Sequence, residues 1–255
     1  MDSKKCWICG NIADSKEHGI KKSNFKTLFG TTGPYKGESE LCLVREDRIL
    51  PLQSADSKYL KFNVLCKNCN NTKTQPFDKA YEKFIIYIDT YEKEILHKRF
   101  IDFSDIYGEN WEDGQRNLYK YLVKSFGSRL ARFNHPIPQD MIDLLDKTSF
   151  KTALRITFAI NEDKVACSQI DKSIYGLGNG DIGVNQSYID RTNNVLFYTY
   201  SEFYNWLYIC YWYNYQSDGS LGSTWIADNQ FVYLGSFFSS LSDTQREEIR
   251  LKLRV

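Results

Sequence analysis

The chain has 255 residues and a formal net charge of only +1, and its aromatic content is high, with 18 Tyr, 16 Phe and 5 Trp. A chain of this length forms one large domain or two modest ones, with ample residues for a hydrophobic core. Its longest apolar stretch, at residues 203–213, is too short to cross a bilayer and contains a polar residue, Asn205. We therefore expect a soluble protein with no membrane segment.

The first part of the chain, residues 1–105, is predicted to combine short strands with one long helix. In chain order we expect a helix at residues 23–29, strands at 40–44, 48–52 and 59–65, and a helix at 76–97. Pro76 fits the first turn of the long helix and Thr74 can cap it, and the apolar residues that follow recur at helical spacing. The Gly- and Ser-rich residues 30–58 are expected to form an irregular insertion.

The second part, residues 106–255, changes from helical to strand-like periodicity after its first helices. In chain order we expect helices at residues 112–133 and 139–145, strands at 153–160, 194–200, 204–215 and 225–234, and a helix at 242–253. The run from Phe197 to Tyr215 is dense in aromatic residues, and because they occupy both faces of the run we expect them to pack in a β core rather than to stack on bases. The fold class is therefore α+β, with one domain at 1–105 and an aromatic-rich α+β domain at 106–255.

Two Cys-x-x-Cys pairs, Cys6 with Cys9 and Cys66 with Cys69, carry the strongest motif. Two residues between thiolates let both sulfurs turn toward one tetrahedral ion, and two such pairs complete a closed four-cysteine zinc site. The alternatives are two coincidental pairs or a redox-active pair. A redox-active pair would call for a thioredoxin-like setting, and Cys6 lies too near the start of the sequence for that. No signal-peptide pattern opens the sequence, so we expect a cytoplasmic protein, whose thiols bind metal rather than form disulfides.

Glu17 and His18 form an acid–histidine doublet between the two pairs. Neighbouring residues on an extended segment point to opposite sides, so one side chain can face a metal ion while the other faces a substrate. Histidine titrates near neutral pH and suits a general base, and glutamate supplies the hard oxygen that Mg²⁺ prefers. The alternative is a surface glutamate beside a structural histidine, which we favour less because the chain has only 3 His.

Asn70 directly follows the second cysteine pair. Its amide oxygen is a poor ligand for zinc but an acceptable one for Mg²⁺. The alternative is a helix N-cap, a position that asparagine also favours. We expect the zinc ion to bring this residue beside Glu17 and His18, so that the three form one site for a second, weakly held divalent ion.

These features together resemble the zinc-containing branch of the HNH endonucleases, also called ββα-metal or His-Me finger nucleases. The residues that carry the resemblance are Cys6-x-x-Cys9, Glu17-His18 and Asn63-Val64-Leu65-Cys66-x-x-Cys69-Asn70. The resemblance covers about residues 4–90 and implies a zinc-stabilised ββα-metal fold in the first domain. There are two departures: Glu17 stands where Asp or His is commoner, and Asn70 stands where the last His is common, which makes this an H-N-N variant.

The resemblance also implies a role for each residue of the motif. His18 is expected to be the general base, and Glu17 and Asn70 are expected to bind a catalytic Mg²⁺ or Mn²⁺ ion. Asn71 takes the ligand role instead of Asn70 if the helix starts one residue later. Asn63 matches the middle asparagine of the family, which orients the loop that carries the histidine. The zinc ion at the four cysteines is expected to be structural.

The resemblance implies hydrolysis of phosphodiester bonds in DNA, leaving a 5′-phosphate and a 3′-hydroxyl. The N-terminal charge fits a polyanion partner, because residues 1–75 carry 13 Lys and Arg against 8 Asp and Glu. We expect a set of basic residues near the motif to hold the phosphate backbone without reading sequence. These are Lys16, Lys21, Lys22, Lys26, Lys67 and Lys73.

Other functions stay open for the chain. One alternative is a zinc-stabilised nucleic-acid-binding or interaction module that has lost catalysis, and another is a ligand-sensing regulator with a structural zinc ion. The second domain is expected to select the substrate, to form a homo-oligomer or to sense a trigger. Analogy with HNH proteins of bacteria and phages, many of which serve in genome defence, favours a role in antiviral defence.

Overall fold

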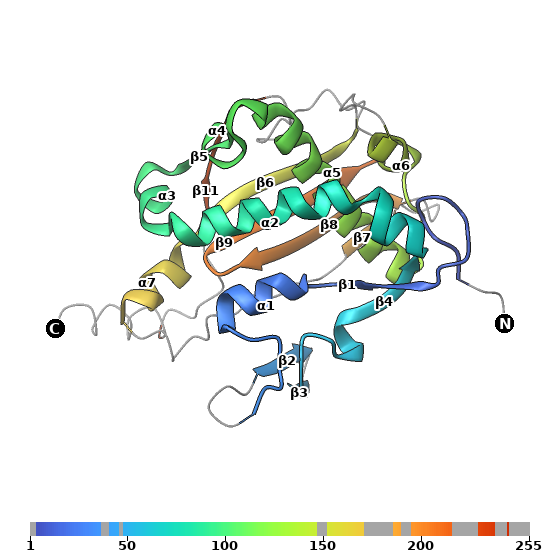
Figure 1. Ribbon diagram of the computed structural model, residues 1–255, viewed down its shortest axis with the longest axis horizontal. Coiled ribbons are helices and arrows are strands. Elements are labelled where there is room, and N and C mark those ends of the chain that lie inside the picture. The colour runs from blue at the N-terminus through green and yellow to red at the C-terminus, as the bar shows by residue number, and fades with distance from the viewer. Residues whose placement is uncertain are drawn as a thin grey trace. The chain divides into compact units, whose positions relative to one another are not determined.

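The computed structural model is a mixture of helices and strands, which confirms the α+β class (Figure 1). It describes residues 4–36, 41–45, 48–146, 152–170, 186–189, 195–215, 229–237 and 244. Among the helices in these ranges, none has both the length and the apolar character that a membrane crossing requires. Almost all of the helix predicted at 242–253 falls outside the described residues.

The chain forms two compact units, and two helices contribute to both. The first unit comprises Met1–Ile86 with Asn117–Lys147, and the second comprises Tyr87–Arg116 with Thr148–Val255. Helix α2 (Gln75–Thr90) begins in the first unit and ends in the second, and α5 (Trp111–Arg132) does the reverse. The domain boundary at residue 105 stays a prediction, because compactness alone does not show which part of a chain folds independently.

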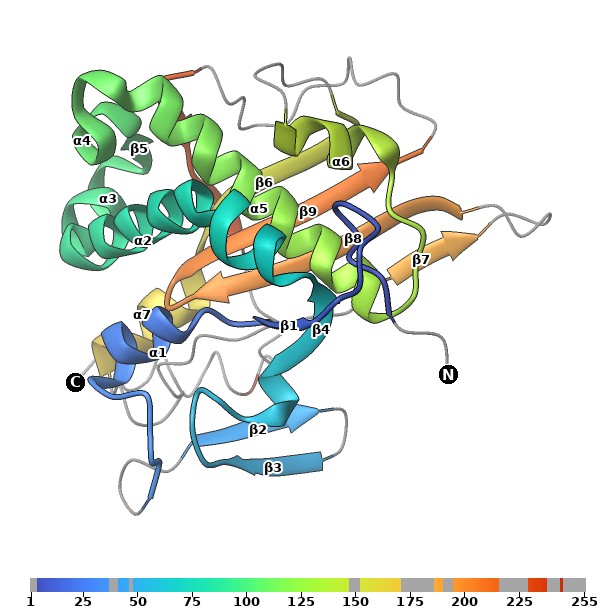
Figure 2. The ribbon, with the colours of Figure 1, turned by 45° about the vertical axis from the view of Figure 1, so that its right-hand side comes forward.

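The first unit is built around one pair of antiparallel strands. β1 (Ser15–His18) pairs with β4 (Lys61–Leu65), with Glu17 opposite Phe62. The other elements of this unit are α1 (Lys22–Phe29), the hairpin strands β2 (Leu41–Arg45) and β3 (Arg48–Leu52), the short helical turns η2 (Lys58–Leu60) and η3 (Asn68–Lys73), and α6 (Gln139–Asp146), besides parts of α2 and α5. The hairpin of β2 and β3 extends away from the β1–β4 pair (Figure 2).

Two groups of buried residues hold the first unit together. The insertion has a small core of its own, which is made of Phe25, Tyr35, Leu52, Ala55 and Leu60. A larger set of apolar residues is buried at helical spacing on α2 and α5, including Phe77, Phe84, Leu118, Leu122 and Phe126. The two helices meet where the rings of Tyr81 and Tyr121 stack with their centroids 3.9 Å apart. This packing places one face of α5 beside the segments that carry the predicted site.

The second unit contains a five-stranded sheet with the order β11-β6-β9-β8-β7. Its strands are β6 (Leu154–Asn161), β7 (Gln186–Ile189), β8 (Val195–Tyr204), β9 (Leu207–Asn214) and β11 (Gly235–Phe237), with all neighbours antiparallel except β11 and β6. The remaining elements are α3 (Glu92–Lys98), the paired strands β5 (Phe100–Asp102) and β10 (Phe231–Tyr233), α4 (Phe103–Tyr107), η4 (Gly108–Asn110) and α7 (Glu162–Ile170). Tyr198, Tyr200, Trp206 and Tyr211 are fully buried, so much of the aromatic run packs in a β core, as predicted, whereas Trp212 and Tyr215 are exposed.

Several predicted element boundaries are wrong; the strand expected at 194–200, for example, is β8 and continues to Tyr204. The helix expected at 76–97 is broken at Tyr91, whose φ of −106° and ψ of 24° are not helical, so that α2 and α3 are separate. The strand expected at 204–215 begins later, because Asn205 adopts a positive φ of 51° and turns the chain from β8 into β9. Asparagine tolerates this left-handed conformation, but the aromatic residues on either side of it conceal the turn in the sequence.

Candidate functional site

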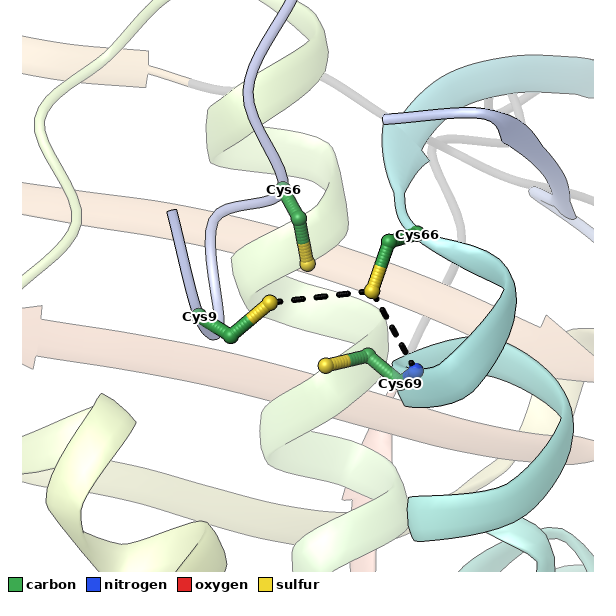
Figure 3. A group of neighbouring side chains, drawn as sticks. All are labelled: Cys6, Cys9, Cys66 and Cys69. Atoms are coloured by element: carbon green, nitrogen blue, oxygen red, sulfur yellow. Dashed lines mark hydrogen bonds between the residues drawn. The ribbon is translucent and has the colours of Figure 1, made fainter. Parts of the chain in front are cut away.

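The four cysteines of the two pairs meet in the first unit (Figure 3). Their sulfur atoms all lie within 4.8 Å of one another, and the Sγ atoms of Cys9 and Cys66 are 3.6 Å apart. Zn–S bonds of about 2.3 Å in a tetrahedron would place the sulfurs about 3.8 Å apart, so the cluster has the size that zinc requires. Three of the cysteines are buried and Cys9 is exposed. The cluster could therefore hold a metal ion such as zinc.

The backbone and the charge of the cluster both suit a thiolate site. Gly10 turns the chain with a φ of 76° and donates its N–H to the carbonyl of Cys6 at 2.8 Å. The N–H of Cys69 lies 3.4 Å from the Sγ of Cys66. Burial raises the pKa of Cys69 well above its usual range, and the neighbouring sulfurs add to this effect. Close thiolates repel one another, so a bound cation is what would keep them ionised.

The first cysteine pair is anchored to β4 and α5 through Trp7. The backbone N–H of Trp7 donates to the carbonyl of Val64 at 3.1 Å, and the indole Nε1–H of Trp7 donates to the Oγ of Ser128 at 3.2 Å. The indole lies so close to Gly127 that a Cβ at this glycine would come within 2.6 Å of the ring. The cysteine cluster is thus joined directly to the helix that lines the other side of the site.

A pocket of about 340 Å³ opens between β1, η3, α2 and α5. Glu17 and His18 from the end of β1 line it together with Asn70 and Asn71 from η3. Each of these two segments follows one of the cysteine pairs, which explains why residues far apart in the sequence reach the same place. The pocket also receives acidic and basic side chains from α2 and α5 that the sequence did not indicate.

Glu17 belongs to a network of buried charges. Its Oε1 lies 3.3 Å from the Nζ of Lys124, which also lies 3.2 Å from the Oδ2 of Asp78. Asp78 in turn lies 3.0 Å from the Nζ of Lys21. Burial raises the pKa of Glu17, whereas the charge of Lys124 lowers it. Lys124, which is only 1% exposed, is therefore the counter-charge of this carboxylate.

His18 is held by a carboxylate from the insertion. Its Nε2 lies 3.3 Å from the Oδ1 of Asp56, and Asp56 also accepts hydrogen bonds from the ammonium groups of Lys22 and Lys61. These lysines hold the pKa of Asp56 far below its usual range. Burial lowers the pKa of His18, although Asp56 acts in the opposite direction. The imidazole is therefore neutral near pH 7 and able to accept a proton.

Asn70 is oriented by β1. Its Nδ2 donates to the Oγ of Ser15 at 3.0 Å and to the carbonyl of Lys16 at 3.4 Å. Because the amide nitrogen is bound in this way, the carbonyl oxygen Oδ1 is the atom that can bind a cation. Asn71 also lines the pocket, but it is more exposed than Asn70. The geometry therefore favours Asn70 over Asn71 as an ordered ligand.

Asn63 lies exposed on β4 and is not among the residues that line the pocket. The segment after His18 is held instead by Arg129 of α5, whose guanidinium donates to the carbonyl of Gly19. Gly19 has no room for a side chain, because a Cβ there would come within 2.7 Å of the ring of Phe62. The orienting role that the resemblance implies for Asn63 stays a prediction.

The six lysines expected near phosphate differ in their surroundings. Four form ion pairs, namely Lys21 with Asp78 and Glu82, Lys22 with Asp56, Lys67 with Asp14, and Lys73 with Asp146. Lys16 and Lys26 are exposed. A nucleic acid would have to compete with carboxylates for the four paired lysines, of which Lys67 is the most exposed.

Sequence reasoning missed Asp56, Asp78 and Lys124. For Lys124 a signal existed in the sequence, because it lies close to the apolar residues Tyr121, Leu122 and Phe126 of the helix predicted at 112–133, and a buried ammonium group needs an acidic partner. Asp78 lies in the first turn of α2, where an acidic residue is common for reasons of helix stability alone. Asp56 lies in an insertion with no regular pattern, so nothing in the sequence indicated that it would reach His18.

The first unit therefore contains a cysteine cluster and a separate pocket with a histidine, carboxylates and a side-chain amide. A zinc ion bound by all four sulfurs would be fully coordinated and would have no position for a substrate. Any chemistry therefore belongs to the pocket. Comparison of the chain with protein-family models, with curated proteins and with solved structures finds no match.

Proposed function

We propose that the chain is a metal-dependent endonuclease of the HNH type that hydrolyses phosphodiester bonds in DNA. The observation that supports this most strongly is that Glu17, His18 and Asn70 line one pocket. The first two end strand β1, and Asn70 lies in the helical segment after the partner strand β4. This is the strand–strand–helix order that the resemblance implies. A structural zinc ion at the four cysteines would hold the two segments together.

His18 is the proposed general base. Its imidazole lines the pocket and is neutral near pH 7, because burial lowers its pKa. It can therefore take a proton from a water molecule as that water attacks phosphorus in line with the leaving 3′ oxygen. The bond from Arg129 to the carbonyl of Gly19 keeps the backbone beside His18 in place during this step. The products are a 5′-phosphate and a 3′-hydroxyl.

A divalent ion completes the proposed site. Glu17 and Asn70 offer the hard oxygen ligands that Mg²⁺ and Mn²⁺ prefer, and Asp78 brings a further carboxylate to the same pocket. When bound, the ion would polarise the scissile phosphate and stabilise the charge on the leaving oxygen. Lys124 competes with the ion for Glu17 and repels a cation placed nearby. We therefore propose a weakly bound ion that is needed at millimolar concentration.

The proposed partner is the sugar–phosphate backbone of DNA. Lys16 and Lys26 are exposed, and lysines in such positions attract phosphate without reading the base sequence. By analogy with HNH proteins of bacteria and phages, we extend the proposal to a cytoplasmic role in antiviral defence.

Cleavage of supercoiled plasmid DNA tests the proposal. The wild type should nick or linearise the plasmid in millimolar Mg²⁺ or Mn²⁺, and it should be inactive when the divalent ion is omitted. Glu17→Gln should slow cleavage about tenfold or more, with partial recovery at higher Mn²⁺ concentration. Glu94→Gln, at an exposed glutamate of α3, is the matched control and should have no effect. A wild type that leaves the plasmid intact at every concentration of both ions would overturn the proposal.

A second candidate function is a nucleic-acid-binding or interaction module that has lost catalysis. It is favoured by the pairing of Glu17 and Asp78 with Lys124, because a carboxylate that already binds an ammonium group is a poorer ligand for a divalent ion. This candidate predicts that the wild type binds DNA with an affinity that falls steeply with salt. It also predicts no cleavage in the plasmid assay.

A further inference from the structure

The insertion at residues 30–58 takes no part in the proposed function, yet its last turn contacts the candidate base. Asp56 lies in that turn, with its Oδ1 3.3 Å from the Nε2 of His18. We propose that Asp56 is a positioning residue that fixes the orientation and the tautomer of the His18 imidazole. The consequence for catalysis rests on the proposed function, but the structural part can be tested without a cleavage assay.

The turn that carries Asp56 is itself held in place. Ala55 is fully buried, and its N–H donates to the carbonyl of Thr32 at 3.0 Å. The N–H of Asp56 lies 3.3 Å from the Oγ of Ser54. These two hydrogen bonds, from the N–H groups of Ala55 and Asp56, fix the backbone of the turn. Asp56 therefore presents its carboxylate to His18 from a defined position.

Three basic groups from three elements converge on this carboxylate. Lys22 is the first residue of α1 and Lys61 the first of β4, and both donate to Asp56. His18 ends β1 directly opposite Lys61 in the strand pair. The two ammonium groups keep the carboxylate ionised, and an ionised carboxylate can only accept hydrogen bonds. The nitrogen of His18 that faces it, Nε2, must therefore carry the hydrogen.

The tautomer decides which nitrogen of His18 can act as a base. With hydrogen on Nε2, the lone pair lies on Nδ1, and this nitrogen is the one that can take a proton from water. A carboxylate in this position also stabilises the imidazolium that forms when the proton is taken. Asp56 would thus orient the imidazole itself, whereas the resemblance assigns to Asn63, which lies exposed on β4, the orientation of the loop that carries the histidine.

Nitrogen-15 NMR of the histidine side chains tests the structural part directly. The chain has only 3 His, so the spectrum is simple and His18→Ala assigns the signals of His18. Well above the ordinary pKa of histidine, the wild type should show only the Nε2–H tautomer, with a proton protected from exchange. Asp56→Ala should show a population with hydrogen on Nδ1 and lose the protected proton. Identical His18 spectra in the two proteins would overturn the proposal.

Kinetics test the catalytic consequence. Asp56→Ala should lower kcat about 10- to 100-fold and leave KM for plasmid DNA unchanged, and Asp56→Glu should recover part of the loss. Glu94→Ala is the matched control, because it removes another exposed carboxylate that is paired with a lysine, Lys98, and it should change neither constant. A rise in kcat or tighter DNA binding in Asp56→Ala would overturn the proposal, because the carboxylate would then be competing with the substrate phosphate for the basic groups.

The two proposals fail in different ways. If the wild type cleaves no DNA but the NMR contrast is as expected, the proposed function fails and the positioning contact stands. If the wild type cleaves DNA and Asp56→Ala changes neither the tautomer nor kcat, the positioning proposal fails alone. Zinc content and amide NMR dispersion show whether Asp56→Ala is folded. If Asp56→Ala does not fold, Asp56→Asn should be measured in the same way. We expect the same direction of change in the His18 tautomer and in kcat.

Discussion

The Nζ of Lys124 lies 3.3 Å from the Oε1 of Glu17, although Lys124 is only 1% exposed. An ammonium group withdrawn from water is costly unless it is paired, and here Asp78 provides a second carboxylate at 3.2 Å. The two ion pairs of Lys124 therefore connect α5 with β1 and α2 at the pocket. It also holds Glu17 where the proposed divalent ion would bind.

Replacing Lys124 by methionine should destabilise the protein strongly. The change nearly preserves side-chain volume but leaves the buried carboxylate of Glu17 without its counter-charge, whereas Asp78 keeps its ion pair with Lys21, and breaking a buried pair in this way costs about 3–5 kcal/mol. Urea denaturation measures the loss in free energy of unfolding. Lys120→Met, one turn earlier on α5, is the matched control and should cost less than about 1 kcal/mol. Lys124→Met as stable as the wild type would show that these ion pairs do not support the fold.

Adding Glu17→Gln to Lys124→Met should restore part of the lost stability. The double variant removes the buried carboxylate of Glu17, which Lys124→Met leaves without its ion pair, and residues in direct contact are not additive in their effects on the free energy of unfolding. Urea denaturation of the two single variants and the double variant gives the coupling energy. A double variant whose loss equals the sum of the single losses would contradict a direct interaction between these side chains.

Gly127→Ala should destabilise the protein although alanine is the better helix former. Alanine would normally gain about 1 kcal/mol in a helix interior, but its Cβ would come within 2.6 Å of the Trp7 ring. Overpacking of this kind costs about 1–3 kcal/mol, and it should also speed the transfer of zinc to a chelator by loosening the first cysteine pair. Denaturation and zinc-release kinetics measure the two effects. A stabilised variant would contradict the contact between Trp7 and Gly127.

Metal analysis should find one zinc ion per chain, bound by the four cysteines. Cys69→Ser should lose the ion and lower the thermal stability, because metal-binding energy contributes to folding when the ligands are brought together only by the fold. Cys210→Ser, on β9 outside the cluster, is the matched control and should keep the zinc. Zinc bound equally well by Cys69→Ser would contradict the assignment.

The ion pairs of Asp56 should make stability depend on pH. Lys22 and Lys61 hold the pKa of Asp56 far below its usual value in the folded protein. The stabilisation is therefore present above the unfolded pKa of about 4 and is lost as the pH falls toward the folded value. Asp56→Asn should be less stable than the wild type at pH 7, and the difference should shrink in acid. The effect should be small, because Asp56 is 44% exposed. A difference that stays constant down to about pH 2 would contradict this account.

The cysteine cluster could be predicted from the sequence because its chemistry is local. Two residues between cysteines suffice to aim both sulfurs at one ion, and the two pairs then determine which segments meet. That is why Glu17, His18 and Asn70 reach one pocket in the structure. Helices and strands with a clear apolar period were also predicted, including the long helix that became α5.

The rest of the site depends on packing between distant segments, which has no local signature. Lys124 reaches Glu17 only because α5 packs against α2 through Tyr81 and Tyr121. Asp56 reaches His18 because the buried Ala55 fixes an irregular turn. Contacts of this kind follow from the tertiary structure, so the sequence pattern indicated the candidate base and metal ligands but not the residues that hold them in place.

The most direct test of the central claim is the single-turnover rate of DNA cleavage by His18→Ala, measured beside the wild type at the same Mg²⁺ concentration. If His18 is the general base, the rate should fall about 100-fold or more. His97→Ala, at an exposed histidine of α3, should leave the rate unchanged. Equal cleavage rates for His18→Ala and the wild type would contradict the account.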